Sequence, residues 1–269
     1  MQEDTQILSD GDVELYARQL VLKGWDELTQ AKLLSAHIAI IGVGGLGMPV
    51  LSYLAGAGVG HITLVEPDKI DKTNLHRQHI PTLSESGTPK IESAKRFVKE
   101  RFSNCNLTCH ETALTEANAD SLLEGCSLVL DCTDRLDTRL MIAHIALKRR
   151  IPHIFAGAIR HEGQISVFAP YHSDFQGSAC FGCIFPSDPD FAQAPSCAQA
   201  GISGPVVGMI GAMQANEALK LLTGIGTPLI GRLLLVDAAT PRFDEIKTSR
   251  QPQCKICTDK RHQPTTENL

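Results

Sequence analysis

The chain has 269 residues, enough for one large domain with a substantial core, and its 43% hydrophobic and 20% charged residues are ordinary for a globular protein. The formal net charge of −5 excludes a general nucleic-acid-binding role, because no basic excess exists to displace counterions from phosphates. The polar start of the chain is unlike a signal peptide, and nine cysteines in such a chain fit a reducing compartment. We therefore expect a cytoplasmic protein without a nucleic-acid partner.

The first predicted elements are helices within residues 1–36, which contain no apolar run suited to a strand. Tyr16-Ala-Arg18-Gln19 is the most distinctive phrase of this segment. We interpret residues 1–36 as an N-terminal helical extension of the domain that follows.

Residues 37–66 predict a strand, a glycine turn, a helix and a second strand that ends at the carboxylate Glu66. The glycines of the turn are Gly42, Gly44, Gly45 and Gly47. Such a turn lets backbone N–H groups approach phosphate oxygens, and the helix N-terminus adds a partial positive charge. An acidic residue after the second strand is placed to bind a ribose. The unit indicates a phosphorylated adenosine cofactor and leaves NAD, FAD and ATP open.

The apolar character of this unit also raises the question of a membrane span. Residues 38–60 carry no charge over 23 positions, which is long enough to cross a bilayer. Seven of these residues are glycine, and the cluster falls where the turn is predicted. A strand and helix buried in a parallel sheet explain the same apolarity, so we expect no membrane association.

The remaining elements follow from apolar periodicity and turn residues. In chain order they are a polar loop at 67–86, a helix at 89–102, a strand at 127–131, a helix at 135–149, strands at 154–158 and 164–169 around a turn at 161–163, an irregular stretch at 170–204, a helix from Pro205 that ends at Gly224, and an antiparallel strand pair at 232–237 and 242–247. This alternation predicts an α/β fold, with a doubly wound, Rossmann-like and mostly parallel sheet that ends in antiparallel strands. We assign residues 37–260 to this domain and 261–269 to a C-terminal tail.

Two C-x-x-C pairs, Cys180/Cys183 and Cys254/Cys257, are the second informative feature. Two such pairs can supply the four thiolates of a tetrahedral zinc site. They are separated by 70 residues, so the fold has to bring them together. A redox-active pair or unrelated free thiols are the alternatives.

The polar loop carries side chains suited to a polyphosphate. They are Asp68, Asp71, Asn74, His76, Arg77 and Gln78, with Lys90 at the start of the next helix. A guanidinium and an ammonium near a glycine turn can neutralise phosphate oxygens. A solvated surface loop is the alternative.

Two further residues are candidates for chemistry. Asp134 follows the strand at 127–131 and is therefore expected at the carboxyl edge of the sheet, where open α/β folds bind ligands. It can hold Mg²⁺ together with phosphate oxygens, the alternative is a helix cap, and both roles could hold together. Cys197 lies in the irregular stretch and is a candidate nucleophile, with an ordinary free thiol as the alternative.

Taken in order, these motifs resemble the prokaryotic relatives of ubiquitin-activating enzyme, the ThiF/MoeB/HesA group. The resemblance runs from about Tyr16 to Cys257. The matching phrases are Tyr16-x-Arg18-Gln19, Ile41-Gly-Val-Gly-Gly-Leu-Gly47, Ala55-Gly-Ala-Gly-Val-Gly60, Asn74-Leu-x-Arg77-Gln78, Pro89-Lys90, Leu130-Asp131-Cys132-Thr133-Asp134, both C-x-x-C pairs, and Ala200-Gly201.

The resemblance implies a homodimeric nucleotidyltransferase that uses Mg·ATP. Its substrate would be the C-terminal glycine of a small ubiquitin-like sulfur-carrier protein that ends in Gly-Gly, in thiamine or molybdopterin biosynthesis. The carrier carboxylate would attack the α-phosphate, and sulfur would then displace the acyl-adenylate to give a thiocarboxylate. Residues 37–260 would form the adenylating domain of this type.

Site residues are implied position by position. The nucleotide contacts would come from Gly42, Gly44, Gly45, Glu66, Thr73, Asn74, Arg77, Lys90, Asp134 and Arg135. Glu66 would hold the ribose hydroxyls and Asp134 the Mg²⁺ ion. The catalytic set would be Arg18, Arg77, Lys90, Asp134 and Cys197, with Arg18 reaching into the site of the partner subunit. The four paired cysteines would be structural zinc ligands.

Two departures from the family pattern affect these expectations. Many relatives have Asp where this chain has Glu66, so the carboxylate is retained on a side chain one methylene longer. A rhodanese domain, which follows in some relatives, is not found, so we expect a separate sulfur donor, either a cysteine desulfurase or a rhodanese.

Three other functions have to be weighed against this one. An NAD-dependent oxidoreductase shares the glycine turn but has no need for Asn74, Arg77, Lys90, Asp134 or the paired cysteines. A related enzyme that adenylates a peptide or modifies tRNA is closer, although the acidic net charge disfavours tRNA. An inactive scaffold would be expected to lack the charged site residues, all of which are present.

Overall fold

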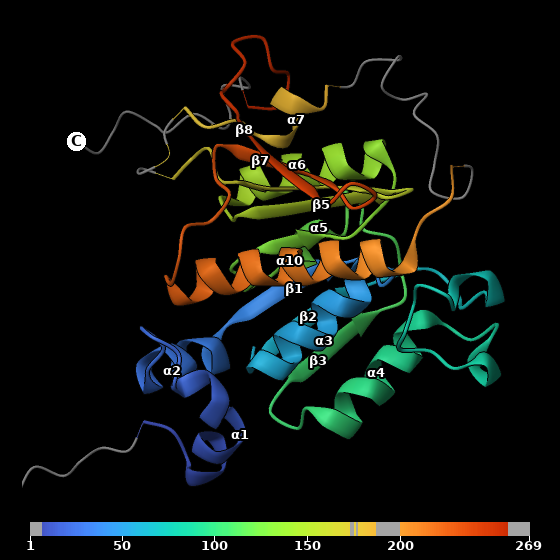
Figure 1. Ribbon diagram of the computed structural model, residues 1–269, viewed down its shortest axis with the longest axis vertical. Helices are drawn as coiled ribbons and strands as arrows, with labels where there is room; N and C mark the ends of the chain where they lie inside the picture. The colour runs from blue at the N-terminus through green and yellow to red at the C-terminus, as the bar shows by residue number, and fades with distance from the viewer. Residues whose placement is uncertain (1–6, 173–174, 176, 187–199, 258–269) are drawn as a thin grey trace, which may run out of the picture.

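The computed structural model describes residues 7–172, 175, 177–186 and 200–257. Its centre is an eight-stranded sheet in the order β3-β2-β1-β4-β5-β6-β7-β8 (Figure 1). The strands are β1 (His37–Ile41), β2 (His61–Val65), β3 (Asn106–His110), β4 (Val129–Asp131), β5 (His153–Ile159), β6 (Glu162–Phe168), β7 (Arg232–Asp237) and β8 (Arg242–Lys247). Pairings from β3 to β5 are parallel, and those from β5 to β8 are antiparallel. The α/β prediction with antiparallel C-terminal strands is therefore confirmed.

Helices cover both faces of this sheet (Figure 1). They are α1 (Asp10–Leu20), α2 (Glu27–Ser35), α3 (Gly47–Ala57), α4 (Lys90–Arg101), α5 (Ala119–Leu122), α6 (Leu136–Arg149), α7 (Phe181–Ile184) and α10 (Gly204–Thr223), with the short 3₁₀ turns η1 (Lys72–Asn74) and η2 (Leu83–Glu85). The largest core cluster packs α3, α4 and α10 against one sheet face, and a second packs α5 and α6 against the other. The sheet is thus doubly wound.

Alternation along β1 explains why both faces can be buried. Ile38 and Ile40 belong to the core beneath α3 and α10, whereas Ala39 and Ile41 belong to the core beneath α6. Successive strand side chains point to opposite faces, so a strand covered on both sides has to be apolar throughout. The uncharged run at residues 38–60 therefore lies in β1, α3 and the segments around them. No helix among the described residues is long and apolar enough to cross a bilayer.

The sheet edge that matters for function is formed by the ends of three neighbouring strands. Ile41 at the end of β1 is level with Val65 in β2 and with Asp131 in β4. The chain leaves β1 toward one side of the sheet and reaches β4 on the other side, so these strands flank a topological switch point. Open α/β sheets bind ligands at such a point, outside the carboxyl ends of the strands.

The structure differs from the sequence prediction at β3 and at the hairpin between β5 and β6, and it adds the short helices α5 and α7, which were not predicted. The edge strand β3 was not predicted, because Asn106–His110 is short, polar at alternate positions and only partly buried. The tip of the hairpin between β5 and β6 lies at Arg160 and His161, not at 161–163, since Glu162 pairs with Ile159. Gly163 is a strand residue where α10 passes close by, and a Cβ there would lie 2.2 Å from the Ile210 side chain.

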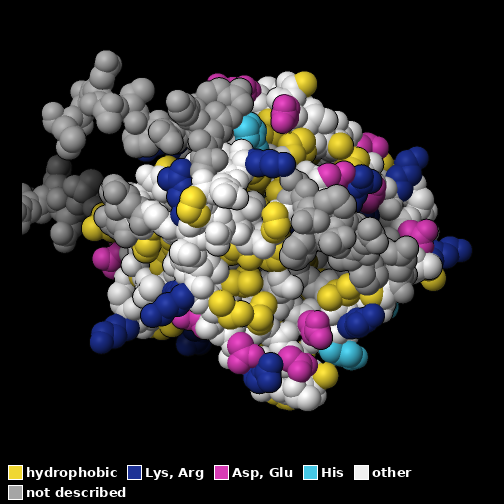
Figure 2. All heavy atoms as spheres, turned by 90° about the horizontal axis from the view of Figure 1, so that it is seen from above, with side chains coloured by type: hydrophobic (Ala, Val, Ile, Leu, Met, Phe, Trp, Pro, Cys, Tyr) yellow, Lys and Arg dark blue, Asp and Glu magenta, His cyan; other side chains and the backbone are white. Residues whose placement is uncertain are grey.

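The other edge of the sheet is β8. It carries four charged residues and two exposed hydrophobic ones, Phe243 and Ile246; the charged residues are Arg242, Asp244, Glu245 and Lys247. The space-filling view of this side of the molecule shows hydrophobic side chains interspersed with charged ones (Figure 2). Charged residues on an edge strand disfavour pairing with other chains.

Candidate functional site

A cavity of about 620 Å³ lies at the carboxyl ends of β1, β2 and β4. Most of the residues that the sequence predicted as nucleotide contacts line it. They are Gly42, Gly44, Gly45, Glu66, Asn74, Arg77, Lys90, Asp134 and Arg135. Thr73 does not line the cavity, because its hydroxyl donates to Asp71 Oδ1 at 2.6 Å on the surface of η1. The fold thus brings together three segments that are far apart in the sequence.

The glycine turn passes close to neighbouring backbone at two positions. Gly42 has φ of 94°, a left-handed conformation that favours glycine, and a Cβ there would lie 3.0 Å from the Cys132 carbonyl oxygen. A Cβ at Gly47 would lie 2.0 Å from the Gly42 carbonyl oxygen. Side chains at these positions would push the turn away from β4 and from the start of α3, and the cradle for a ligand would open.

Glu66 is 4% exposed and joins the glycine turn to the polar loop. Its Oε2 accepts a hydrogen bond from the Val43 N–H at 2.6 Å, and its Oε1 accepts one from the Asp68 N–H at 2.8 Å. Lys90 Nζ lies 3.6 Å from Glu66 Oε2 and 2.9 Å from Asp68 Oδ2. A carboxylate offers about four acceptor positions, so Glu66 can support the turn and still accept ribose hydroxyls.

Arg77 is held in place by its own loop. Its Nη2 donates to Asn74 Oδ1 at 2.7 Å, and its Nη1 donates to the Thr73 carbonyl oxygen at 3.2 Å. The turn of η1 brings these partners within reach, because Arg77 follows Thr73 and Asn74 by about one helical turn. The guanidinium is therefore pre-ordered at the cavity wall, where it can bind phosphate oxygens.

Asp134 lies on the exposed rim of the cavity, in the segment between β4 and α6. The N-cap position of α6 is taken by Arg135 and not by Asp134, so the capping alternative does not hold. Next to it, Arg135 forms a bidentate pair with Asp137, with Nη2 2.7 Å from Oδ2 and Nε 3.1 Å from Oδ1. The hydrogen bond from Arg135 lowers the pKa of Asp137 to about 2.

Three residues that were not predicted from the sequence line the cavity from the first turn of α6: Asp137, Thr138 and Arg139. The sequence did contain a signal for these residues. They begin the helix that follows a central strand, and the N-terminus of such a helix lies at the same sheet edge as the end of that strand. Arg139 also lies over the Phe155 ring, with its guanidinium carbon 5.0 Å from the ring centroid.

Cys132 lines the floor of the cavity and is 7% exposed. Its thiol donates to Gln214 Oε1 at 3.3 Å, and burial raises the pKa of Cys132 well above its usual value. A thiol held in the protonated state is a poor nucleophile. Cys197, the nucleophile predicted from the sequence, lies outside the described residues.

The four paired cysteines converge, as the sequence predicted. Cys180 Sγ lies 3.7 Å from Cys183 Sγ and 3.5 Å from Cys254 Sγ, and Cys183 Sγ lies 3.5 Å from Cys257 Sγ. All four sulfur atoms lie within 4.8 Å of one another. Bonds of about 2.3 Å to a tetrahedral zinc ion place sulfurs about 3.8 Å apart, so the cluster fits a metal ion. The Gln251 N–H donates to Cys183 Sγ at 3.3 Å, a contact that stabilises a thiolate.

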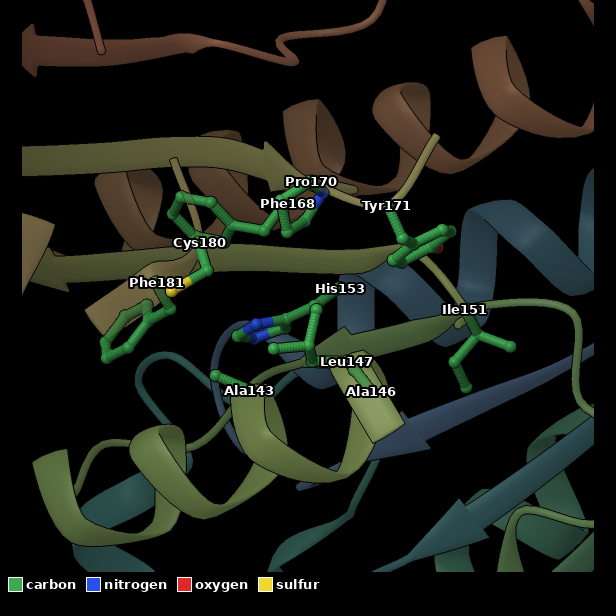
Figure 3. Close-up of a pocket in the computed structure, with 10 residues that line it drawn as sticks. All are labelled: Ala143, Ala146, Leu147, Ile151, His153, Phe168, Pro170, Tyr171, Cys180 and Phe181. Carbon is green, nitrogen blue, oxygen red and sulfur yellow. The ribbon is translucent and has the colours of Figure 1, made fainter. Parts of the chain in front are cut away.

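This cluster forms no part of the wall of the large cavity. It joins α7 to the segment that follows β8, and Arg250 donates from Nη2 to the Cys257 carbonyl oxygen. Cys180 instead lines a small apolar cavity of about 10 Å³ with His153, Phe168 and Phe181 (Figure 3). The position of the cluster therefore indicates a structural role.

Arg18 is far from the cavity of its own chain. It is exposed on α1, and its neighbour Gln19 donates from Nε2 to the Ala57 carbonyl oxygen at the C-terminal end of α3. The glycine turn lies at the other end of α3, about 16 Å away for an 11-residue helix. Arg18 therefore has no contact with the site that its own chain forms.

Comparison with known proteins places this geometry in a family. The chain matches the ThiF family over residues 16–256. It is 39% identical over 258 residues to the adenylyltransferase and sulfurtransferase MOCS3 of Drosophila grimshawi, covering 96% of this chain and 57% of that protein. It is 36% identical over 252 residues to the protein of the same name from Drosophila sechellia, covering 93% and 54%. The chain thus spans about half the length of the curated relatives it matches.

Solved structures share the fold. The structure of E. coli MccB with ATP has a TM-score of 0.77 at 20% identity, covering 94% of this chain and 76% of that one. The structure of PaaA has a TM-score of 0.76 at 20% identity, covering 93% and 79%. At this identity the likeness concerns the fold, whereas the sequence match extends over nearly the whole chain. The chain therefore belongs to the ThiF family.

Proposed function

We propose that this protein is an adenylyltransferase that activates the C-terminal glycine of a small ubiquitin-like sulfur-carrier protein with ATP. The observation that carries the proposal is the convergence of the glycine turn, Arg77, Lys90 and Asp134 on one cavity at the switch point of the sheet. The curated relatives, named adenylyltransferase and sulfurtransferase, support the same reaction.

The site favours a nucleotide polyphosphate over a dinucleotide. Arg77 faces the cavity from the turn after η1, and Lys90 faces it from the start of α4. Two cations so placed can bind the oxygens of a triphosphate. Hydride transfer to or from a nicotinamide has no need for this pair of cations or for the carboxylate at Asp134. The NAD-dependent alternative is therefore disfavoured by the composition of the cavity wall.

In the proposed reaction, the carrier carboxylate attacks the α-phosphate of ATP. A bond forms between a carboxylate oxygen and that phosphorus, and the bond to the bridging oxygen of pyrophosphate breaks. Arg77 and Lys90 stabilise the negative charge that develops on the phosphate oxygens, which is the main catalytic contribution in such transfers. Glu66 orients the ribose. Asp134 would hold Mg²⁺, which would supply positive charge against the leaving pyrophosphate.

Sulfur transfer completes the proposed function. A persulfide on the sulfur donor, a cysteine desulfurase or a rhodanese, attacks the acyl carbon of the adenylate, so a C–S bond forms and AMP leaves. The Cys197 thiolate then attacks the donor's sulfur in the resulting acyl disulfide. The S–S bond breaks, the carrier leaves as a thiocarboxylate, and Cys197 is left in a disulfide with the donor that an external thiol reduces. The pathway is thiamine or molybdopterin biosynthesis, and the structural metal is zinc.

A homodimer is part of the proposal. The N-terminal helices and the turn between them expose a set of hydrophobic side chains, Leu15, Val21, Leu22 and Leu28, each more than half exposed. Clustered apolar side chains on a surface mark an interaction site. A second copy that covers these helices would carry Arg18 toward the other subunit's cavity, which Arg18 does not reach within its own chain.

The direct test is ATP–pyrophosphate exchange by the purified protein. We expect exchange that depends on Mg²⁺ and on a carrier ending in Gly-Gly, and that stops when the final glycine is deleted. Exchange with short peptides and none with carriers would instead favour a peptide-adenylating enzyme. No exchange with either substrate, in protein that binds ATP, would contradict the proposed reaction.

A further inference from the structure

Thr133, the residue before Asp134, is held at all three of its polar groups. Its N–H and its hydroxyl donate to Asp131 Oδ1 at 3.0 and 2.7 Å. Its carbonyl oxygen accepts from Arg139 Nε at 3.2 Å and Nη2 at 2.5 Å. The backbone of Thr133 determines where the Asp134 carboxylate lies on the cavity rim, so these contacts act as a clamp on the proposed Mg²⁺ site.

The two partners of Thr133 in this clamp, Asp131 and Arg139, each contact a buried aromatic side chain. Asp131 is fully buried, and its other oxygen, Oδ2, accepts from His153 Nε2 at 3.3 Å. Arg139 lies over the Phe155 ring. The Phe181 ring then contacts both supports, with centroid distances of 5.8 Å to His153 and 5.1 Å to Phe155.

Phe181 is joined to the four-cysteine cluster through the backbone, because it is the first residue of α7 and directly follows Cys180. Figure 3 shows the His153 ring between Phe181 and Cys180 on one side and Leu147 on the other. A continuous set of contacts therefore runs from the cysteine cluster through Phe181 and His153 to Asp131 and Thr133. His153 does not line the large cavity, so it cannot touch a bound nucleotide there.

His153 also stabilises the buried carboxylate of Asp131. Burial alone raises the pKa of Asp131, but the hydrogen bond and charge of His153, with the charge of Arg139, lower the pKa overall. Asp131 thus remains an acceptor for both Thr133 donors. Removing the donor to a buried carboxylate oxygen leaves that oxygen without its hydrogen bond, which favours rearrangement of the segment.

We propose that His153 is a positioning residue, which couples the four-cysteine cluster to the Thr133–Asp134 segment and so sets the geometry of the Mg·ATP site. The identity of the ligand rests on the function proposed above, whereas the clamp itself is a property of this chain alone.

The test compares three variants with the wild type. His153→Phe keeps an aromatic ring but loses the donor to Asp131, and His153→Gln restores an N–H at the place of Nε2. Leu123→Ala lowers stability in the core beneath α5 and α6, away from the clamp, and serves as a control. The two readouts are amide hydrogen exchange at Thr133 and Asp134 without ligand, and the Mg²⁺ concentration that half-saturates ATP binding.

In His153→Phe, we expect amide exchange at these two positions to be about ten-fold faster, as for local opening of the segment, and half-saturation to need several times more Mg²⁺. His153→Gln should recover most of both effects, and Leu123→Ala should show neither. If His153→Phe does not fold, Phe181→Leu replaces it with the same readouts. Equal exchange and equal Mg²⁺ dependence in His153→Phe and Leu123→Ala would overturn the inference. The two proposals can fail separately. If the wild type does not bind Mg·ATP but amide exchange is still faster in His153→Phe, the proposed function is wrong and the role of His153 in holding Thr133 is supported.

Discussion

The backbone N–H of Val43 donates to the Glu66 carboxylate at 2.6 Å, and this contact ties the glycine turn after β1 to the end of β2. The same carboxylate is 3.6 Å from Lys90 Nζ, which is almost fully buried. One side chain thus connects the phosphate cradle, the polar loop and a proposed catalytic cation, so the fold and the site depend on the same contact.

Replacing Glu66 should therefore affect stability and ligand binding together. Glu66→Ala removes the acceptor of two N–H groups and part of the charge around Lys90, which should lower the free energy of unfolding by about 3 kcal/mol. Urea unfolding and ATP titration measure the two effects. The exposed pair Lys95–Glu92 supplies a control, since Glu92→Ala should cost less than about 0.5 kcal/mol. Equal losses in the two variants would contradict the role of Glu66.

Asp134→Asn tests the proposed Mg²⁺ site. The amide keeps the size of the side chain but loses the negative charge that a divalent ion requires, so pyrophosphate exchange should fall by about 100-fold or more. Asp120→Asn, which changes an exposed carboxylate paired with Arg149, should leave exchange unchanged. Near-normal exchange in Asp134→Asn would remove this residue from the metal site.

The cysteine cluster predicts a bound metal in the purified protein. Cys254→Ser should release zinc and lower the thermal stability, since a site with three thiolates binds the ion more weakly and no longer joins α7 to the segment after β8. Elemental analysis and thermal unfolding give the two readouts. Cys105→Ser changes a half-buried thiol outside the cluster and is the matched control. Unchanged metal content in Cys254→Ser would refute the four-cysteine assignment.

The dimer prediction can be tested by mixing inactive subunits. Arg18→Ala and Lys90→Ala should each reduce pyrophosphate exchange strongly. Dimers with one subunit of each kind should recover part of the activity, because one of their two sites has an intact Arg18 from one subunit and an intact Lys90 from the other. Mixed dimers purified through two different tags make the measurement unambiguous. No recovery in such dimers would contradict an arginine that acts across the interface.

The stability of the protein at acidic pH should depend on Glu85. The hydrogen bond from Arg96, with help from the Thr82 N–H, lowers the pKa of Glu85 from 4.5 to about 2. Because the folded pKa is below the unfolded one, this contribution is fully present above pH 4.5 and is lost as the pH falls toward 2. Since Arg96 is 38% exposed, solvent screening reduces the contribution to about 1 kcal/mol.

Unfolding measured between pH 2 and 6 checks this expectation. Glu85→Gln should flatten the dependence by about that amount. Glu100→Gln, which changes a weaker partner of the same Arg96 at 3.4 Å, should leave the dependence nearly unchanged. If the free energy of unfolding of Glu85→Gln depends on pH as steeply as that of the wild type, the pH dependence comes from other groups.

The sequence by itself determined the elements whose signals are local. The strands at His37–Ile41, Arg232–Asp237 and Arg242–Lys247 follow from short apolar or alternating runs. The end of α10 follows from Gly224, because glycine is the residue type that most readily adopts the left-handed φ of 74° found there. The position of the cavity could also be predicted from the sequence, because the carboxyl ends of neighbouring parallel strands lie at the same edge of the sheet. The edge strand β3 was not predicted, because its five residues are too few, and too polar at Asn106, Thr108 and His110, to give a strand signal.

Tertiary structure decided which distant residues meet. The 70 residues between the cysteine pairs leave their convergence open until the sheet has formed and α7 has packed beside the segment after β8. The distance of Arg18 from its own cavity, and the clamp from His153 through Asp131 to Thr133, likewise have no local pattern. Such contacts depend on the order of strands and on how side chains pack between layers, and periodicity along the chain does not encode either.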